Sequence, residues 1–331
     1  MNLTSISSRT TKHHVNLHQS LSIDEAISLI EKLQANLNQA VVIDEPVLKL
    51  IIATILADGH LLLVDVPGVG KTLIAKTLAH SISASFKRIQ CTPDLLPSDI
   101  TGTSIYHRKE ERFIFVAGPL FAQFVLVDEI NRATPRTQSS LLESMAENQV
   151  TVDGDVHYME KPFFLIATQN PIETAGTFPL PEAQLDRFLI SLSIGYPDFD
   201  DEVRILEREE YEDPLSHIEP VLSPLDILAL QQLVRTISVA RPLKEYIVAL
   251  IVATRNHSDI LLGASPRGGV ALQRAAQAIA ILNRRNFVTP DDVKQVAKHV
   301  LTHRLITYEQ DRDIQDEVID SILSTVPIPV R

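Results

Sequence analysis

The sequence has a single cysteine and no long apolar run, and each shortage excludes a class of protein. Cys91 is the only cysteine among 331 residues, so an internal disulfide framework is excluded. No apolar run approaches the length needed to span a bilayer, and no apolar core of a signal peptide follows the N-terminus. We therefore expect a cytoplasmic protein without membrane insertion. The 45% apolar content is enough for two packed domains of ordinary size.

Basic charge is also scarce. Thirty basic residues against 42 acidic ones give a net charge of -12, so a nucleic-acid duplex would meet a repulsive average field unless a local basic stripe overrides it. We therefore expect no nucleic-acid partner. The first 20 residues differ, because they carry Arg9, Lys12 and three histidines but no acid. This composition favours a flexible tail over a metal site formed by His13, His14 and His18.

The stretch from Asp65 to Thr72 reads D-V-P-G-V-G-K-T and has the context of a phosphate-binding loop. It follows the apolar run from Leu61 to Val64, which predicts a strand, and precedes a helix-like segment from Leu73 to Leu78. Gly68 and Gly70 allow the backbone to turn its amide hydrogens inward, and the following helix directs its positive dipole end to the same place. The order strand, glycine loop, helix predicts a P-loop.

Within this loop, two side chains have predicted roles toward a nucleotide. Lys71 would reach the β and γ phosphates, and the Thr72 hydroxyl would hold magnesium. The pattern G-x-x-x-x-G-K-[ST] requires glycine where this chain has Asp65, and the alternative is an ordinary strand-to-helix turn with an exposed lysine. The residues that we expect to bind nucleotide are Pro67, Gly68, Val69, Gly70, Lys71, Thr72, Leu73 and Asp128.

Polar side chains follow two further predicted strands. The apolar run from Phe124 to Val127 ends in Asp128 and Glu129, the pattern of a Walker B element. Asp128, with Thr72, would bind magnesium, while Glu129 would orient and deprotonate the attacking water. The alternative is a solvated strand end. The strand from Phe163 to Thr168 delivers Asn170 at its carboxyl end, where a polar contact to the γ phosphate belongs in a parallel sheet.

Two segments predict hairpins, near 104–118 and 149–158. In the first, apolar residues from Ile105 to Val116 flank the charged tip from Arg108 to Arg112. In the second, Asp153-Gly154 supplies a type I′ turn. Helical spacing of apolar residues also predicts helices over 22–37 and 44–57.

Three long strings resemble the MoxR family of AAA+ ATPases, and the similarity runs from about Ala40 to Leu305. They are D-E-I-N-R-A at 128–133, A-T-Q-N-P-I-E at 167–173 and P-L-P-E-A-Q-L-D-R-F at 179–188. The resemblance implies an α/β fold with a P-loop AAA+ parallel sheet flanked by helices, followed by a small all-helical lid domain. It also implies assembly as a ring of six.

The resemblance assigns catalytic roles to further residues. Asn170 matches the sensor 1 residue, Arg187 the arginine finger and Arg267, in G-A-S-P-R-G, the sensor 2 residue. The two arginines also have a simpler interpretation, since arginine commonly caps a helix or forms an exposed ion pair. Arg132 and Arg136 lie close to the Walker B element and could also sense a neighbouring subunit.

The chain departs from the family pattern at Asp65, where glycine is usual, and at Ile43, where an adenine-side V-V-G-Q motif normally has glycine. We expect both departures to affect the affinity for nucleotide and not the fold. The expected domains are a tail at 1–20, the AAA+ core at 21–197, a proline-bearing acidic linker at 198–223 and the helical lid at 224–331. Within the lid, apolar faces predict helices over 225–238, 243–256, 267–282 and 291–305.

The function implied by the resemblance is that of a MoxR-like chaperone or assembly factor, which uses ATP and Mg²⁺ to remodel client proteins. Its expected partners are further copies of the same chain in a hexamer, and client proteins such as those with von Willebrand factor A domains. One alternative is a nucleotide-switched scaffold with little turnover, which Glu129 and Arg187 argue against. Another is a DNA-associated motor, but the 149–158 hairpin carries Asp153 and Asp155 and no lysine.

Overall fold

The computed structural model describes residues 21–172, 176–209, 215–216, 218–309 and 312–329. The predicted N-terminal tail, with its histidines, lies outside these residues. Over the described part of the chain, no helix is long and apolar enough to cross a membrane.

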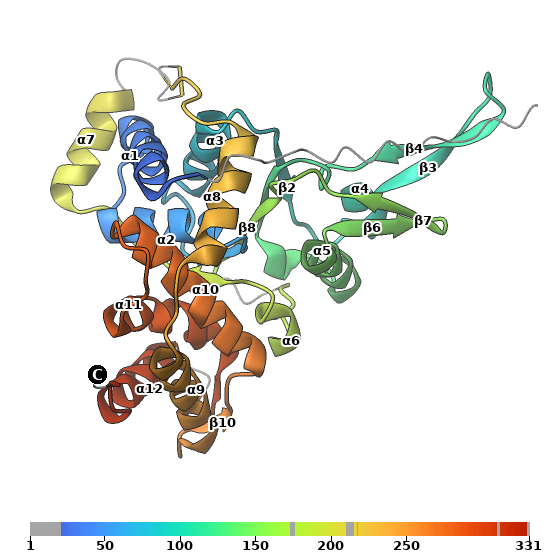
Figure 1. The fold of residues 1–331 in the computed structure, drawn as a ribbon. Coiled ribbons are helices and arrows are strands. Elements are labelled where there is room, and N and C mark those ends of the chain that lie inside the picture. The colour runs from blue at the N-terminus through green and yellow to red at the C-terminus, as the bar shows by residue number, and fades with distance from the viewer. Residues whose placement is uncertain (1–20, 173–175, 210–214, 217, 310–311, 330–331) are drawn as a thin grey trace, which may run out of the picture.

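A five-stranded parallel sheet forms the centre of the molecule, as the sequence predicted (Figure 1). Its strand order is β2-β5-β8-β1-β9, so the strand before the P-loop and the strand of the Walker B element are separated by one strand. The strands are β1 (Leu61–Val64), β2 (Phe86–Gln90), β5 (Phe124–Asp128), β8 (Phe164–Gln169) and β9 (Ile190–Leu192). Because all of them run in one direction, their carboxyl ends meet at one edge, where ligands bind in open parallel sheets.

Alternating side chains divide the core between the two faces of the sheet. Leu61 and Leu63 belong to one buried cluster and Leu62 to the other, as the period of two in a strand requires. The first face is covered by α1 (Ile23–Ala40), α2 (Glu45–Leu56) and α3 (Lys71–Ser81). The second face carries α4 (Pro97–Thr101), η1 (Ile130–Arg132) and α5 (Pro135–Glu147).

Two antiparallel hairpins project from the second face and form an arm (Figure 1). They are β3 (Gly102–His107) with β4 (Arg112–Ala117), and β6 (Gln149–Val152) with β7 (Asp155–Tyr158). Asp153 and Gly154 have φ values of 52° and 90°, as both central residues of a type I′ turn must. Phe115 of the first hairpin stacks on His157 of the second with ring centroids 3.8 Å apart. Both hairpins were predicted from the sequence.

The C-terminal helices form the lid, and they pack against the core without a break in the apolar interior. One hydrophobic cluster runs from α1 and α2 through the sheet into the lid. The lid is helical, as the sequence predicted, and it also contains a short two-stranded ribbon, β10 with β11. Its elements are α8 (Pro224–Thr236), α9 (Arg241–Asn256), β10 (Ile260–Leu262), α10 (Pro266–Leu282), α11 (Pro290–Leu301), η2 (Thr302–Arg304), β11 (Ile306–Thr307) and α12 (Arg312–Thr325).

Two further helical segments follow β8 in the chain before the lid begins. The first, α6 (Glu182–Leu185), precedes β9, and the second, α7 (Phe199–Glu209), lies within the stretch predicted as a linker. The proline and acid content of this stretch concealed apolar residues at helical spacing, at positions 199, 203 and 206.

Candidate active site

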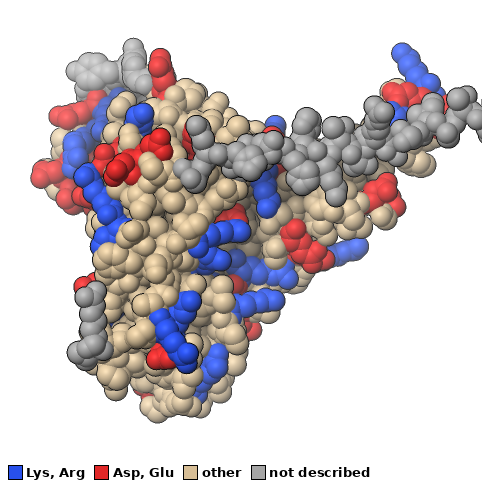
Figure 2. Space-filling model, in the orientation of Figure 1, with Lys and Arg blue, Asp and Glu red and all other residues tan. Residues whose placement is uncertain are grey.

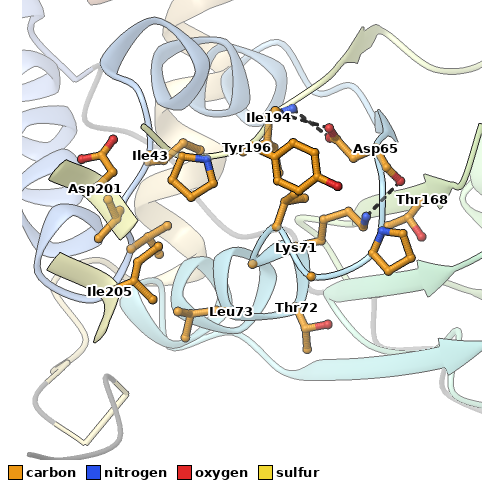
Figure 3. Close-up of a pocket in the computed structure, with 18 of the residues that line it drawn as sticks. Ile43, Asp65, Lys71, Thr72, Leu73, Thr168, Ile194, Tyr196, Asp201 and Ile205 are labelled. Carbon is orange, nitrogen blue, oxygen red and sulfur yellow. Dashed lines mark hydrogen bonds between the residues drawn. The ribbon is translucent and has the colours of Figure 1, made fainter. Parts of the chain in front are cut away.

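A cavity of about 680 Å³ lies at the carboxyl ends of the central strands (Figure 3). Its volume is in the range typical of small-ligand sites. All of the residues that the sequence predicted to bind nucleotide line this cavity, and so do Glu129 and Asn170. The parallel sheet brings them together because the segments that carry them follow β1, β5 and β8, which are neighbours in the sheet.

The loop between β1 and α3 has the geometry of an anion-binding turn. Gly68 and Gly70 have φ values of 94° and 80°, a left-handed region that favours glycine. A Cβ added to either glycine would meet no heavy atom within 4 Å, so the space around the loop is open to a ligand. Lys71 Nζ donates to the backbone carbonyls of Asp65 (3.2 Å) and Val66 (2.6 Å). Its cation is therefore already held over the loop.

The environment of Lys71 combines two opposing effects. Burial lowers the pKa of Lys71, and the carboxylates of Asp65, Asp128 and Glu129 oppose this lowering. The three acids thus favour the charged amine, the form that would pair with a phosphate.

Asp128, at the end of β5, is almost fully buried, and both of its carboxylate oxygens accept hydrogen bonds. One carboxylate oxygen accepts a hydrogen bond from Arg88 Nε at 2.6 Å and the other from Thr168 Oγ1 at 3.2 Å. A carboxylate and the nearby Thr72 hydroxyl form an oxygen donor set that suits magnesium. These two residue types, which line the same cavity, fit a magnesium ion, and the ion would share the Asp128 carboxylate with Arg88.

Glu129 is held in a different way from its neighbour. Its φ of 56° lies in the left-handed region, which is uncommon for a residue with a side chain and is often found at functional sites. Its backbone N–H donates to Thr168 Oγ1 at 2.9 Å. Its carboxylate accepts hydrogen bonds from Gln90 Nε2 and Arg132, each at 3.1 Å. Contacts to the backbone and to the side chain of Glu129 therefore orient its carboxylate independently of that of Asp128.

The sequence did not predict Arg88, Gln90 or Thr168 as part of the site. Arg88 and Gln90 are two residues apart on β2 and so point to the same face of the sheet. The parallel pairing of β2 with β5 places Gln90 beside Asp128. Two polar residues at alternate positions near the end of a strand were the available signal, but it identifies the site only when the strand order is known.

Asp65, the departure from the P-loop pattern, is directed away from the phosphate position. Its side chain accepts hydrogen bonds from Ser193 Oγ (2.6 Å) and from the backbone N–H groups of Ile194 (2.8 Å) and Gly195 (3.1 Å). Figure 3 shows this carboxylate turned toward Ile194. The negative charge is thus matched by donors, and it fastens the segment after β9 to the start of the P-loop.

That segment leads into Tyr196 and α7, which line one side of the cavity with both apolar and charged side chains. Figure 3 shows Tyr196 between Ile43 and Lys71, with Ile205 of α7 on the same side as Ile43. Asp201 also lines the cavity from α7. An aromatic ring beside aliphatic side chains is the environment that a flat base requires. Part of the stretch predicted as a linker therefore belongs to the site.

Arg187 and Arg267, predicted as catalytic, do not line the cavity in the described part of the chain. They lie near each other, because Asp186 accepts a hydrogen bond from Ser265 Oγ at 3.0 Å and Ser265 Oγ accepts one from Arg267 N at 3.1 Å. Figure 2 shows basic side chains gathered on the face between the hairpin arm and the lid. Of the two alternative arginines, Arg132 reaches Glu129 and Arg136 is exposed at the start of α5.

Comparisons with known proteins agree with this geometry. Residues 60–190 match the family model described as ATPase family associated with various cellular activities (AAA), and residues 252–322 match the AAA lid domain. Chaperone MoxR1 of Mycobacterium tuberculosis is 39% identical over 315 residues, which cover 92% of this chain and 83% of that protein. This chain is a member of the MoxR family of AAA+ ATPases.

Two other matches extend over nearly the whole chain. The MoxR-family chain is 47% identical over 306 residues to the protein YeaC of Bacillus subtilis, covering 92% of this chain and 96% of that one. It also superposes on the crystal structure of a protein assigned as an ATPase from Cytophaga hutchinsonii. The TM-score is 0.86 and the identity 36%, over 93% of this chain and 97% of that one. Fold and family were therefore predicted correctly from the sequence.

Proposed function

We propose that the protein binds ATP with magnesium in this cavity and hydrolyses it. One observation carries the proposal: Lys71 and Thr72 of the P-loop line the same cavity as Asp128 and Glu129 of the Walker B strand. Thr72 and Asp128 would hold magnesium, which supplies neutralisation of phosphate charge when bound. Lys71 would pair with the β and γ phosphates, and Asn170 would contact the γ phosphate. The Glu129 carboxylate would accept the proton of the attacking water.

The role of Glu129 is tested by Glu129→Gln, which keeps the shape of the side chain but cannot accept that proton. We expect ATP binding to persist while turnover falls by about 10² or more. Glu143→Gln, on the exposed side of α5, makes the same chemical change outside the cavity and should leave turnover unchanged. Wild-type turnover by the Glu129 variant would contradict the proposed mechanism.

We further propose that Arg187 and Arg267 serve the nucleotide of a neighbouring subunit in a hexameric ring. Their absence from the lining of the cavity of their own subunit supports this arrangement. An arginine on an exposed face can complete the neutralisation of a phosphate that another subunit binds. If so, activity per subunit should rise with protein concentration as rings form. Light scattering with ATP should then detect a species near six subunits, and a fully active monomer would refute the ring.

We take the purpose of ATP hydrolysis from the relatives of this protein. A relative named as a chaperone supports a function in remodelling client proteins. Clients with von Willebrand factor A domains are implied only by the resemblance. Purification of the Glu129→Gln variant with ATP from native cells, followed by mass identification of bound proteins, tests this step, because a variant that binds without hydrolysing should retain its clients. Stimulation of the ATPase by duplex DNA instead of protein would contradict it.

A further inference from the structure

The short loop that presents Arg187 is held by a buried charge from the lid. Arg304 of η2 is 6% exposed, and its Nε donates to Asp186 Oδ1 at 2.8 Å. The same guanidinium donates to the backbone carbonyl of Asp186 at 3.3 Å, to that of Leu189 at 3.2 Å and to that of Phe188. Arg304 therefore contacts the chain immediately before and after Arg187.

The buried guanidinium of Arg304 holds this loop in place, because it must stay paired. Burial lowers the pKa of Arg304, and Asp186 opposes the lowering through its charge and its hydrogen bond. Because a guanidinium stays charged in proteins and is costly to bury unpaired, each of its donors needs an acceptor. The loop at 186–189 supplies most of these acceptors, so a shift of the loop would leave donors of a buried charge unpaired.

A second lid element holds the other oxygen of Asp186. Ser265, the N-cap of α10, donates from Oγ to Asp186 Oδ2 at 3.0 Å and accepts from Arg267 N at 3.1 Å. His303 of η2 adds a contact between its Nε2 and the Phe188 carbonyl at 3.1 Å. The Asp186 carboxylate is therefore bridged between η2 and α10, the element that begins next to Arg267.

The side chain of Arg187 differs from its surroundings. Within the described residues, it makes no hydrogen bond or ion pair, and it is partly exposed. Its backbone is thus fixed from both sides, while its guanidinium remains available to a group outside the subunit.

We infer that Asp186, Arg304 and Ser265 are positioning residues that fix Arg187 to the lid and hold it in register with Arg267. The inference rests on the proposed role of Arg187 as a finger for the neighbouring subunit. Its consequence is mechanical: any displacement of the lid in one subunit moves both arginines together at the nucleotide of the next.

The decisive variant is Asp186→Asn, compared with Asp292→Asn as a matched control. Asp292 is likewise a carboxylate paired with an arginine, since Arg285 donates to it at 2.6 Å, but it caps α11 and does not contact the 186–189 loop. We expect Asp186→Asn to lower kcat at least tenfold, with the Kd for ATP changed less than twofold. Asp292→Asn should lower the melting temperature but leave kcat within twofold of wild type.

Two further measurements separate positioning from general damage. Amide hydrogen exchange over residues 182–190 should accelerate in Asp186→Asn and stay unchanged in Asp292→Asn. Ser265→Ala removes a single hydroxyl and should lower kcat about threefold or more, whereas Ser265→Thr keeps the hydroxyl and should retain wild-type kcat. If Asp186→Asn does not fold, this serine pair decides the question.

The outcomes test the positioning role of Asp186 and Ser265 separately from the proposed role of Arg187 as a finger. If Arg187→Ala loses turnover while Asp186→Asn and Ser265→Ala retain it, the positioning role is overturned and the finger stands. If Arg187→Ala itself retains wild-type turnover, both are overturned. Loss of turnover in all three variants, with normal ATP affinity and with faster exchange only around 182–190, supports the inference.

Discussion

Replacing Asp65 by the glycine that the P-loop pattern requires should weaken ATP binding. A simple charge argument predicts the opposite, because the change removes a carboxylate beside the expected site of a triphosphate. The structure gives this carboxylate a different task, since it accepts three hydrogen bonds from Ser193, Ile194 and Gly195 at 2.6 to 3.1 Å. These bonds hold the segment that places Tyr196 and α7 at the cavity. Weaker ATP binding by Asp65→Gly would therefore support the structural role, and tighter binding would support the charge argument.

The size of the effect follows from the contribution of these bonds. A hydrogen bond to a charged group contributes about 1.5 to 3 kcal/mol to stability. Losing the equivalent of one such bond would lower the ratio of molecules with this segment in place to molecules with it displaced about tenfold. Because the apparent Kd rises as the competent fraction falls, ATP affinity should drop by up to about tenfold.

Calorimetric titration with ATP measures this affinity directly, at matched pH and salt. Ser193→Ala is the control for a single lost hydrogen bond with the charge retained, and it should weaken binding less than Asp65→Gly does. If Asp65→Gly binds ATP as tightly as wild type or more tightly, the structural role given to Asp65 is wrong and the charge argument holds.

Three further predictions test separate parts of the molecule. Lys71→Ala should raise the Kd for ATP at least tenfold, about 1.4 kcal/mol, and an unchanged Kd in the same titration would remove Lys71 from the site. Tyr196→Ala should raise that Kd about fivefold, about 1 kcal/mol, with kcat unchanged and with Tyr196→Phe close to wild type; equal binding by both variants would exclude base stacking. Burial lowers the pKa of His60 to about 4. Below its unfolded value of about 6.5 only the unfolded state takes up the proton, so the free energy of unfolding should fall by roughly 3 kcal/mol between pH 7 and pH 4. Urea unfolding should show a smaller fall in His60→Gln, and an equal fall would assign the pH dependence to other groups.

The parts of the site that sequence could predict are those encoded within short segments. The P-loop combines its strand, glycines and helix start within 65–72 and the flanking runs, so local physics places Lys71 and Thr72 at the cavity. The Walker B carboxylates follow directly from an apolar strand. In each case the chemistry and the backbone conformation are written in adjacent residues.

The missed contributors depend on pairing between distant segments. Gln90 and Arg88 reach the carboxylates only because β2 pairs with β5 in one particular register. Tyr196 belongs to the site only because Asp65, far away in the sequence, holds the segment before it. The joint position of Arg187 and Arg267 depends on the ion pair between Arg304 and Asp186. No sequence motif marks this pair, because it acts through the burial of Arg304.

The central claim is a shared active site, in which one subunit supplies Glu129 and its neighbour supplies Arg187. Arg187→Ala and Glu129→Gln should each be inactive alone, the first because it lacks a charge clamp worth about 10³ to 10⁵ in rate. Equal mixing with verified subunit exchange pairs an intact Glu129 with an intact Arg187 at about a quarter of the interfaces of random closed rings. ATPase activity should then return from two inactive proteins. Activity that stays at the floor at every mixing ratio, with exchange demonstrated by labelled subunits, would contradict the claim.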